Sequence, residues 1–230
     1  MQTEEIRSDA QPRVMLQPIA APSVLGLYGL AGATFMVAAE MAHWFGSGST
    51  TALLLVPFAA IFGGLAQFLS GMWAFKARDA VATAVHGMWG AFWMAFGILA
   101  VIMVEGKAPL PATPLFPALG YWFVVLAAIT WVCTGAASAE NASLTTTLFF
   151  LSLGSTVSAV ALLTGIHALI VLSGYLFLAC SLAAWYTASA LMVNEAFGRE
   201  VWALGRSTQA QSMPSIAMGI GEPGVIRGQA

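Results

Sequence analysis

Residues 62–75 read FGGLAQFLSGMWAF, an apolar stretch that holds paired glycines and one amide, Gln67, near its middle. The whole chain of 230 residues is 59% hydrophobic and 8% charged, whereas soluble domains carry about 25% charged residues. Long apolar runs of this kind indicate segments that cross a membrane. An amide inside such a segment needs an explanation, because a polar group without a partner is costly in hydrocarbon.

The apolar runs predict an all-α integral membrane protein with six transmembrane helices inside residues 24–193. A crossing needs roughly 20 residues, and the runs do not alternate with period two, so helices are expected rather than a barrel. The six predicted spans are about 24–44, 53–75, 81–104, 118–138, 144–163 and 167–193. We expect a helix extension over 194–205 and a disordered tail over 206–230, which is rich in Gly, Ser, Pro and Gln.

The basic residues are distributed unevenly between the two sides of this topology. One side has Lys107 alone, and the side that holds both termini has seven: Arg7, Arg13, Lys76, Arg78, Arg199, Arg206 and Arg227. Lys and Arg accumulate in cytoplasmic loops. The asymmetry therefore predicts a multi-pass protein of the inner (plasma) membrane, with the N-terminal segment 1–23 and the C-terminal residues both in the cytoplasm.

The sequence shows no signature of an enzyme, a cofactor site or a metal site. It lacks the GxxxxGK phosphate loop, the HExxH pair and a CxxC motif. Both cysteines, Cys133 and Cys180, lie in apolar runs, where a cysteine is usually a small packing residue. The net charge of −2 gives no reason to expect nucleic acid as a partner. We therefore expect a non-enzyme without cofactor or metal.

Hydroxyls and one amide supply most of the polarity deep in the predicted spans. Gln67 lies on a face of small residues with Gly64 and Gly71, which points it to the protein interior. It either makes a hydrogen bond between helices or lines a path. Ser152, Ser155 and Thr156 cluster in LSLGSTVS at 151–158, where hydroxyls usually bond back to their own helix.

Three ionisable residues within or near the spans are candidates for a functional role. Glu40 and His43 share a helix face near the non-cytoplasmic end of the first span. An intramembrane acid is a functional candidate, but at this depth Glu40 also reaches the interface. His86, about 8 Å from the cytoplasmic end of the third span, is either a proton-responsive group or a core histidine.

Several motifs in order resemble the acetate uptake transporter family, the bacterial succinate–acetate/proton symporters and fungal acetate permeases. FGGLAQFLSGMWAFK, with Gly63 and Gly64, and then DAVATAVHGMWGAFW are similar to its second and third helices. APSVLGL resembles its NPAPLGL signature and keeps Pro22, Leu25, Gly26 and Leu27. MVNEAFGREVWALG is similar to its closing NExxGR…LG segment, with Asn194 and Glu195.

The resemblance implies a hexameric ring of six-helix protomers, each with its own substrate path. By alignment, the narrowest point of that path falls on Leu30, Trp89 and Leu153, with Gln67 beside it. Counted at 1.5 Å per residue from the cytoplasmic ends, these four residues lie about 9 to 14 Å deep. This places them in one slab near the middle of a core of roughly 30 Å.

The resemblance also implies that small monocarboxylates, acetate above all and succinate as a larger candidate, cross with protons or through a channel-like path. The expected partners are thus a small carboxylic acid, protons, membrane lipid and further copies of the chain. Two alternatives stay open: a channel for small neutral solutes such as urea or short amides, and a non-transporting membrane subunit whose small-residue faces bind partners.

The charge asymmetry makes a direct prediction about sidedness. Reporter fusions placed after residue 230 and within the 105–117 loop should report opposite sides of the membrane, with the first on the cytoplasmic side. The same side for both fusions would contradict the six-span topology.

Overall fold

The computed structural model describes residues 20–46, 49–104, 116–207, 217–218 and 226–227. Six of its helical segments are long and apolar enough to cross a membrane, which confirms the predicted spans. In chain order the elements are α1 (Pro22–Met41), α2 (Ser49–Phe58), η1 (Ala59–Ala66), α3 (Gln67–Ala77), α4 (Ala80–Val104), α5 (Pro117–Ala137), α6 (Ala142–Thr164), α7 (His167–Phe197), β1 (Ala217–Met218) and β2 (Ile226–Arg227).

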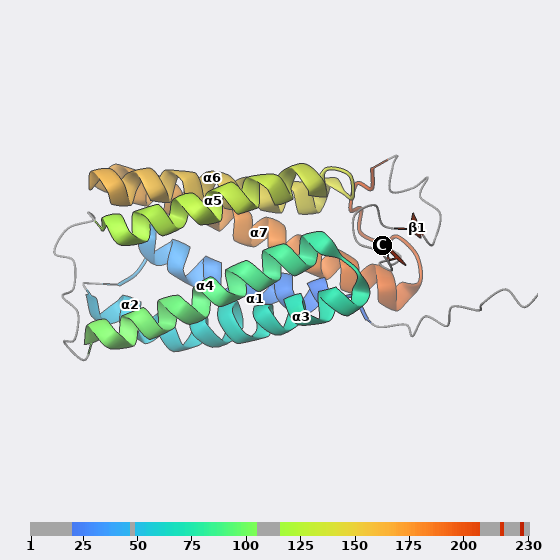
Figure 1. The fold of residues 1–230 in the computed structure, drawn as a ribbon, viewed down its shortest axis with the longest axis horizontal. Helices are drawn as coiled ribbons and strands as arrows, with labels where there is room; N and C mark the ends of the chain where they lie inside the picture. Colours follow the sequence, from blue (N-terminus) through green and yellow to red (C-terminus); the bar gives the residue numbers. More distant parts are fainter. Residues whose placement is uncertain (1–19, 47–48, 105–115, 208–216, 219–225, 228–230) are drawn as a thin grey trace, which may run out of the picture.

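The helices form two halves that meet along one long seam. α5 and α6 pack together on one side of the bundle and α3 and α4 on the other, with α1 and α7 between them (Figure 1). α1 and α7 contact each other extensively, whereas α4 meets α5 over a much smaller area. Near one end of the seam, Tyr28 Oη lies 2.9 Å from Ser189 Oγ. Near the other, a Cβ on Gly174 would lie 2.9 Å from the amide nitrogen of Ala42, so only glycine allows the approach.

The second span is not the uninterrupted α-helix that its apolar run predicts. Pro57 lies in α2 and has no amide hydrogen, so it cannot continue the i→i−4 ladder. The next turns, η1, form a π-helix of eight residues that includes Gly63 and Gly64. Segments of π-helix inside α-helices are rare and are frequent at functional sites. Gln67 is the first residue after this segment.

Glycines let α4 come close to the second span. A Cβ on Gly71 would lie 2.6 Å from the amide nitrogen of Gly87, and a Cβ on Gly90 would lie 2.5 Å from that of Phe68. Small residues at such contacts bring backbones into van der Waals range, which is how helices associate where burial from water gives no driving force.

The helix extension predicted over 194–205 is wrong beyond Phe197. Gly198 adopts φ +63° and ends α7, a conformation that glycine takes without strain. The chain then turns back. The Asn194 side-chain oxygen accepts from the amides of Val201 and Trp202, and its nitrogen donates to the Trp202 carbonyl.

The returning segment caps the start of α6. The carbonyls of Gly205 and Leu204 accept from the amides of Ala142 and Ser143, which begin α6, at 2.9 and 3.1 Å. The tail prediction for 206–230 falls mostly outside the described residues; within it β1 and β2 pair antiparallel. The prediction for the N-terminal segment also falls outside them as far as residue 19.

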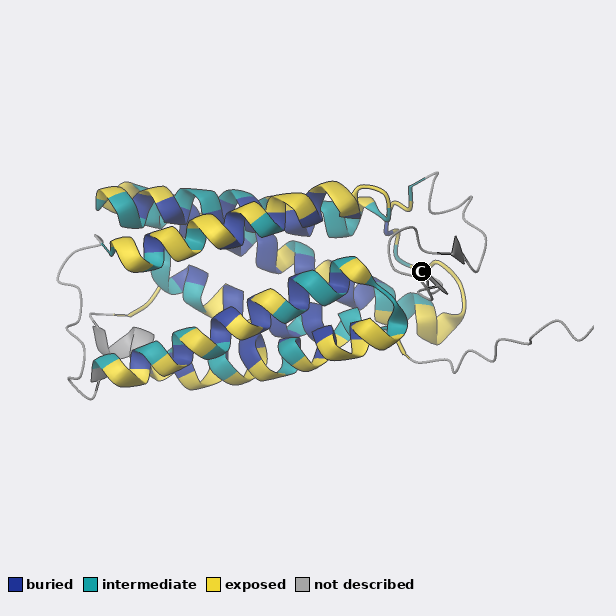
Figure 2. Cartoon of the chain, in the orientation of Figure 1, coloured by how far each residue is buried: buried dark blue, intermediate teal, exposed yellow. Residues whose placement is uncertain are grey.

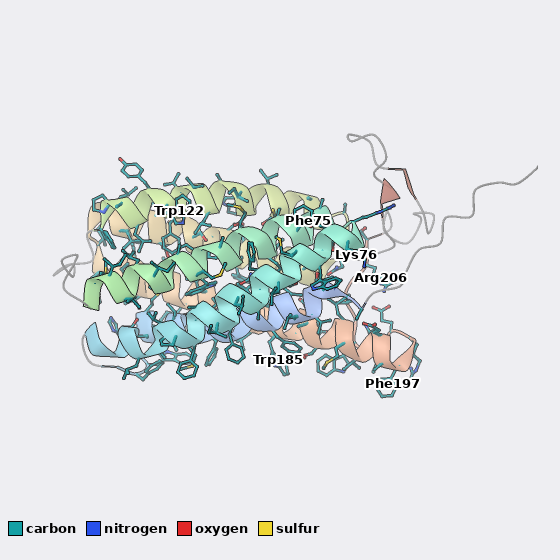
Figure 3. All side chains as sticks on the ribbon, turned by 60° about the horizontal axis from the view of Figure 1, so that its bottom comes forward. Phe75, Lys76, Trp122, Trp185, Phe197 and Arg206 are labelled. Atoms are coloured by element: carbon teal, nitrogen blue, oxygen red, sulfur yellow. The ribbon has the colours of Figure 1, made fainter. Side chains whose placement is uncertain are left out.

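The outer surface of the bundle is apolar. Buried residues line the interior and exposed ones the outer faces of the helices (Figure 2). Large exposed side chains occur on several spans, among them Phe58, Ile98, Val132 and Leu182. Such a surface suits lipid or neighbouring subunits rather than water. Trp185 and Phe197 project outward from α7 (Figure 3). Lys76 and Arg206 lie at the end of the bundle where α7 finishes (Figure 3).

The glycine contacts on α4 predict different outcomes for two alanine substitutions three residues apart: a loss of stability at Gly90 and little change at Gly87. Gly90→Ala should lower thermal stability by about 1–3 kcal/mol, because the new methyl meets the Phe68 backbone. Gly87→Ala is the matched control, since a Cβ there meets nothing within 4 Å. Thermal unfolding in detergent measures both variants. Equal melting of Gly90→Ala and the parent would show that the contact is absent.

Candidate functional site

Five buried side chains carry polar atoms without a hydrogen-bond partner among the residues that the structure describes. They come from α1, α3, α4 and α6 and are at most 5% exposed: Thr34, Gln67, His86, Trp93 and Ser158. Buried polar atoms in proteins are nearly always paired, and each exception calls for an explanation. In a membrane protein, such atoms facing the interior are able to bind water or a polar solute.

Gln67 has the largest unused hydrogen-bonding capacity of these side chains. It is 0% exposed, and neither its oxygen nor its nitrogen has a partner within the described part of the chain. The amide offers two donors and an acceptor. On the side of α1, a Cβ on Gly29 would clash with the carbonyl oxygen of Phe62 and lie 3.6 Å from the amide nitrogen of Gln67, so α1 runs close to this part of the second span. Gln67 is thus an interior amide, and the prediction of a hydrogen bond between helices is not met.

Trp89 connects the two halves of the bundle. Its Nε1 donates to Thr130 Oγ1 on α5 at 3.0 Å, and Thr130 in turn donates to the Leu126 carbonyl at 2.6 Å. The indole N–H of Trp89 already has an acceptor in Thr130. Trp89 therefore offers the interior an apolar ring and no free hydrogen-bond donor. Trp93, one turn further on α4, keeps its Nε1 unpaired within the described residues.

Leu30 and Trp89 belong to one cluster of buried residues, and Leu153 does not. Leu153 is only partly buried, whereas Leu151 is 0% exposed and belongs to that cluster. Two residues along a helix turn a side chain by about 200°. Leu151 and Leu153 therefore face different directions on α6, and the placement of Leu153 at the narrow point, with Leu30 and Trp89, stays a prediction.

The serine and threonine cluster of α6 is mostly satisfied by its own helix. Ser152 donates to the Leu148 carbonyl, Ser155 to that of Leu151 and Thr156 to that of Ser152, at 2.7 to 2.8 Å. Ser152 and Thr156 also reach α5, where they contact Thr134 Oγ1 and Trp131 Nε1. These hydroxyls hold α5 and α6 together, and only Ser158 remains unpaired among the described ones of α6.

The three ionisable candidates lie in two places. His86 is 2% exposed, and its ring packs against Gly26, where a Cβ would lie 2.5 Å from the ring. This is a packed core histidine at the contact of α1 with α4. Glu40 is half-buried at the far end of α1, and His43 beyond it is exposed and contacts His167. Neither Glu40 nor His43 joins the interior group around Gln67.

A sequence profile described as the GPR1/FUN34/yaaH family matches residues 5–198, which is most of the chain. The chain belongs to the GPR1/FUN34/yaaH family. It is 24% identical over 189 residues to the succinate-acetate/proton symporter SatP of Escherichia coli K12 and to that of Shigella flexneri, covering 82% of this chain and 97% of each relative. A solved structure titled as the bacterial acetate channel SatP superposes with a TM-score of 0.74 at 22% identity, over 82% of this chain and 100% of the other.

In this GPR1/FUN34/yaaH family member, the motif residues found by resemblance have structural roles. Pro22 begins α1, and its carbonyl accepts from Ser70 Oγ at 2.6 Å. Gly63 packs against Ala33 and Trp93, and Gly64 against Met94. Leu27 is fully buried and Leu25 is exposed. Glu195 accepts the Gly198 amide through its carbonyl and so takes part in ending α7.

Sequence reasoning gave no site role to Thr34, Trp93 or Ser158. Trp93 follows Trp89 by four residues and so shares its helix face, which is a signal that the sequence does contain. Thr34 follows Leu30 in the same way on α1, and Ser158 follows Ser155 by three on α6. An unpaired state is not visible in a sequence, because it depends on which helix lies opposite.

The unpaired amide predicts a gain of stability when it is removed. Gln67→Leu should raise the free energy of unfolding by about 1–3 kcal/mol, because a buried polar group without a partner is replaced by an apolar one of similar size. Thr130→Val is the comparison, since it removes the acceptor of a satisfied bond and should lower stability by a similar amount. Thermal unfolding in one detergent measures both. A loss of stability in Gln67→Leu would show that the amide is paired.

Proposed function

We propose that this chain carries small monocarboxylates, acetate above all, across a membrane through a path inside each protomer. Membership of the GPR1/FUN34/yaaH family supports transport, and the relatives from Escherichia coli and Shigella flexneri are named succinate-acetate/proton symporters. The single observation that carries the proposal is Gln67, an amide that is fully buried with both polar atoms unpaired in the described structure.

The interior favours the acid form of the substrate. All of the buried polar side chains among the described residues are uncharged Ser, Thr or Gln, apart from His86. A bare carboxylate entering this region loses its hydration without meeting a fixed positive charge, which is very costly. Protonation removes that cost. Passage of the acid together with its proton, or of an anion shielded by neutral donors, therefore fits the residues present.

Specific groups replace the water that the solute loses. Gln67 offers both donors and an acceptor, Thr34 a hydroxyl and Trp93 an N–H donor. Leu30, Trp89 and Leu153 provide the apolar surround, with the Trp89 ring held in place by Thr130. A narrow apolar passage with a few such groups is the arrangement that selects solutes in channels.

The proposal includes the setting of the protein. The chain acts as a transporter and not as an enzyme, lies in the inner membrane with both termini in the cytoplasm, and assembles as a hexameric ring. The exposed apolar side chains on the outer faces support contacts with lipid and with neighbouring copies. Native mass spectrometry from mild detergents tests the ring, and a monomer in all of them would contradict it.

A channel for urea or short amides is the second candidate, because an uncharged interior with one amide suits neutral solutes as well. Uptake into liposomes separates the two functions. We expect labelled acetate to enter faster at pH 5 than at pH 8, since the protonated fraction is larger, and labelled urea to enter no faster than in protein-free liposomes. Urea uptake that is insensitive to pH, without acetate uptake, would replace the proposal with the second candidate. Uptake of neither would favour a non-transporting subunit.

Variants of the path should change acetate uptake in opposite directions. Gln67→Leu should lower it about two- to tenfold, the effect of losing one hydrogen bond to the solute. Trp89→Ala should raise uptake and admit succinate, because it removes a bulky ring from the interior. Trp131→Phe is the control, since it deletes an indole N–H on the exposed outer side of α5. Parental uptake in all three folded variants would mean that the path lies elsewhere.

A further inference from the structure

Two histidines face each other where α1 ends and α7 begins. His43 Nε2 and His167 Nε2 are 3.3 Å apart, the ring centroids are 5.0 Å apart and the ring planes differ by 3°. Both side chains are exposed, so solvent ions can reach them. Because the two residues are 124 positions apart in the chain, no sequence motif contains the pair.

These distances agree with two imidazoles that share one metal ion. Zinc–nitrogen bonds of about 2.0–2.1 Å at a tetrahedral angle put the two nitrogens about 3.4 Å apart and the ring centroids about 5.2 Å apart. A hydrogen bond directed along both ring axes would place the centroids farther apart, at about 5.6 Å, and 3.3 Å is long for an N–H donor, which prefers about 2.7–3.2 Å. The rings are stacked, and their centroid separation of 5.0 Å is closer to the first value.

The backbone around His43 holds its side chain in this position at a conformational cost. His43 has φ +59°, in the left-handed region that is uncommon for residues other than glycine, although histidine adopts it more often than most. The turn is closed by hydrogen bonds from the His43 amide to the Glu40 carbonyl and from the Trp44 amide to the Ala39 carbonyl, both 2.9 Å. Strained backbone of this kind concentrates at functional sites.

His167, the other member of the pair, is held in position by the close contact between α1 and α7. His167 is the first residue of α7, and Gly174, two turns later, contacts Ala42, the residue that precedes His43. Both histidines are therefore attached to helices whose separation is set by a backbone contact. A pair held in this way requires little rearrangement to bind an ion.

The local charge favours a cation. Glu40 lies one turn before His43 and interacts with it electrostatically. No group of three or more His, Cys, Asp or Glu side chains within the described residues is arranged to hold a metal. Two protein ligands are therefore available, and water occupies the other positions of the ion.

We propose that His43 and His167 form a surface site for a divalent transition-metal ion that prefers imidazole ligands, such as Zn²⁺. The bound ion ties the end of α1 to the start of α7. Imidazole suits Zn²⁺, Cu²⁺ and Ni²⁺, whereas Mg²⁺ prefers oxygen ligands. The site departs from the expectation of no metal drawn from sequence motifs, and it is independent of the proposed transport.

Calorimetric titration of Zn²⁺ into the purified full chain, prepared without a histidine tag, tests the site at pH 7.5. We expect one ion per chain and a rise in melting temperature, because the ion binds the folded state. His43→Gln and His167→Gln should each weaken binding at least tenfold. The chain has only three histidines and His86 is buried, so the double variant has no exposed histidine left. Mg²⁺ is the control ion and should give no binding.

Binding that is unchanged in both single variants, or no binding by the parent, would refute the site. A second measurement needs no variant. Diethyl pyrocarbonate modifies exposed imidazoles, and mass spectrometry of the parent should show that Zn²⁺ protects His43 and His167 together. Equal modification with and without Zn²⁺ contradicts the proposal. None of these readouts depends on solute uptake, so failure of the metal site and failure of the transport proposal are distinguishable.

Discussion

Contacts between glycine and the backbone of a neighbouring helix hold together the half of the bundle that carries Gln67. Gly29 on α1 contacts the Phe62 carbonyl in η1, and Gly90 on α4 contacts the Phe68 backbone in α3. In a membrane these close approaches take the place of the hydrophobic effect, because lipid tails are as apolar as the side chains. Because glycine has no side chain, these residues leave the space next to Gln67 unfilled. The amide is enclosed because three backbones come together around it.

The interior is polar in two different ways. On the side of α5 and α6, hydroxyls bond to their own helix and to each other, as Thr134 does with Ser152, so this polarity stabilises helix packing. On the side of α1, α3 and α4, the side chains of Thr34, Gln67, His86 and Trp93 keep polar atoms unpaired among the described residues, whereas on α6 only Ser158 does. Selection for stability alone would replace such polar groups with apolar ones or give them hydrogen-bond partners. Their retention on one side supports a role in binding a solute there, under the proposed function.

Composition predicts the spans well, since span detection sums over about 20 residues and a boundary error of a few residues changes little. Side-chain direction is far more sensitive. Each step along a helix rotates the side chain by about 100°, so Leu151 is fully buried while Leu153, two residues on, is only partly buried. Partners between helices are also invisible locally: Trp89 is satisfied by Thr130, 41 residues away. The π-helix after Pro57 and the stop at Gly198 have local signals in proline and glycine, which the apolar pattern masks.

The proposed dependence on the acid form needs no titrating group in the protein. A protonated carboxylic acid has one donor and one acceptor, and Gln67 has both to offer in return. The carboxylate has acceptors only, so it would leave the Gln67 oxygen without a donor and add an unsatisfied buried acceptor, worth about 1–3 kcal/mol, to the cost of its own dehydration. Discrimination between acid and anion then comes from matched hydrogen bonds. This explains why Glu40 and His43 can lie outside the interior group while the solute still brings its proton with it.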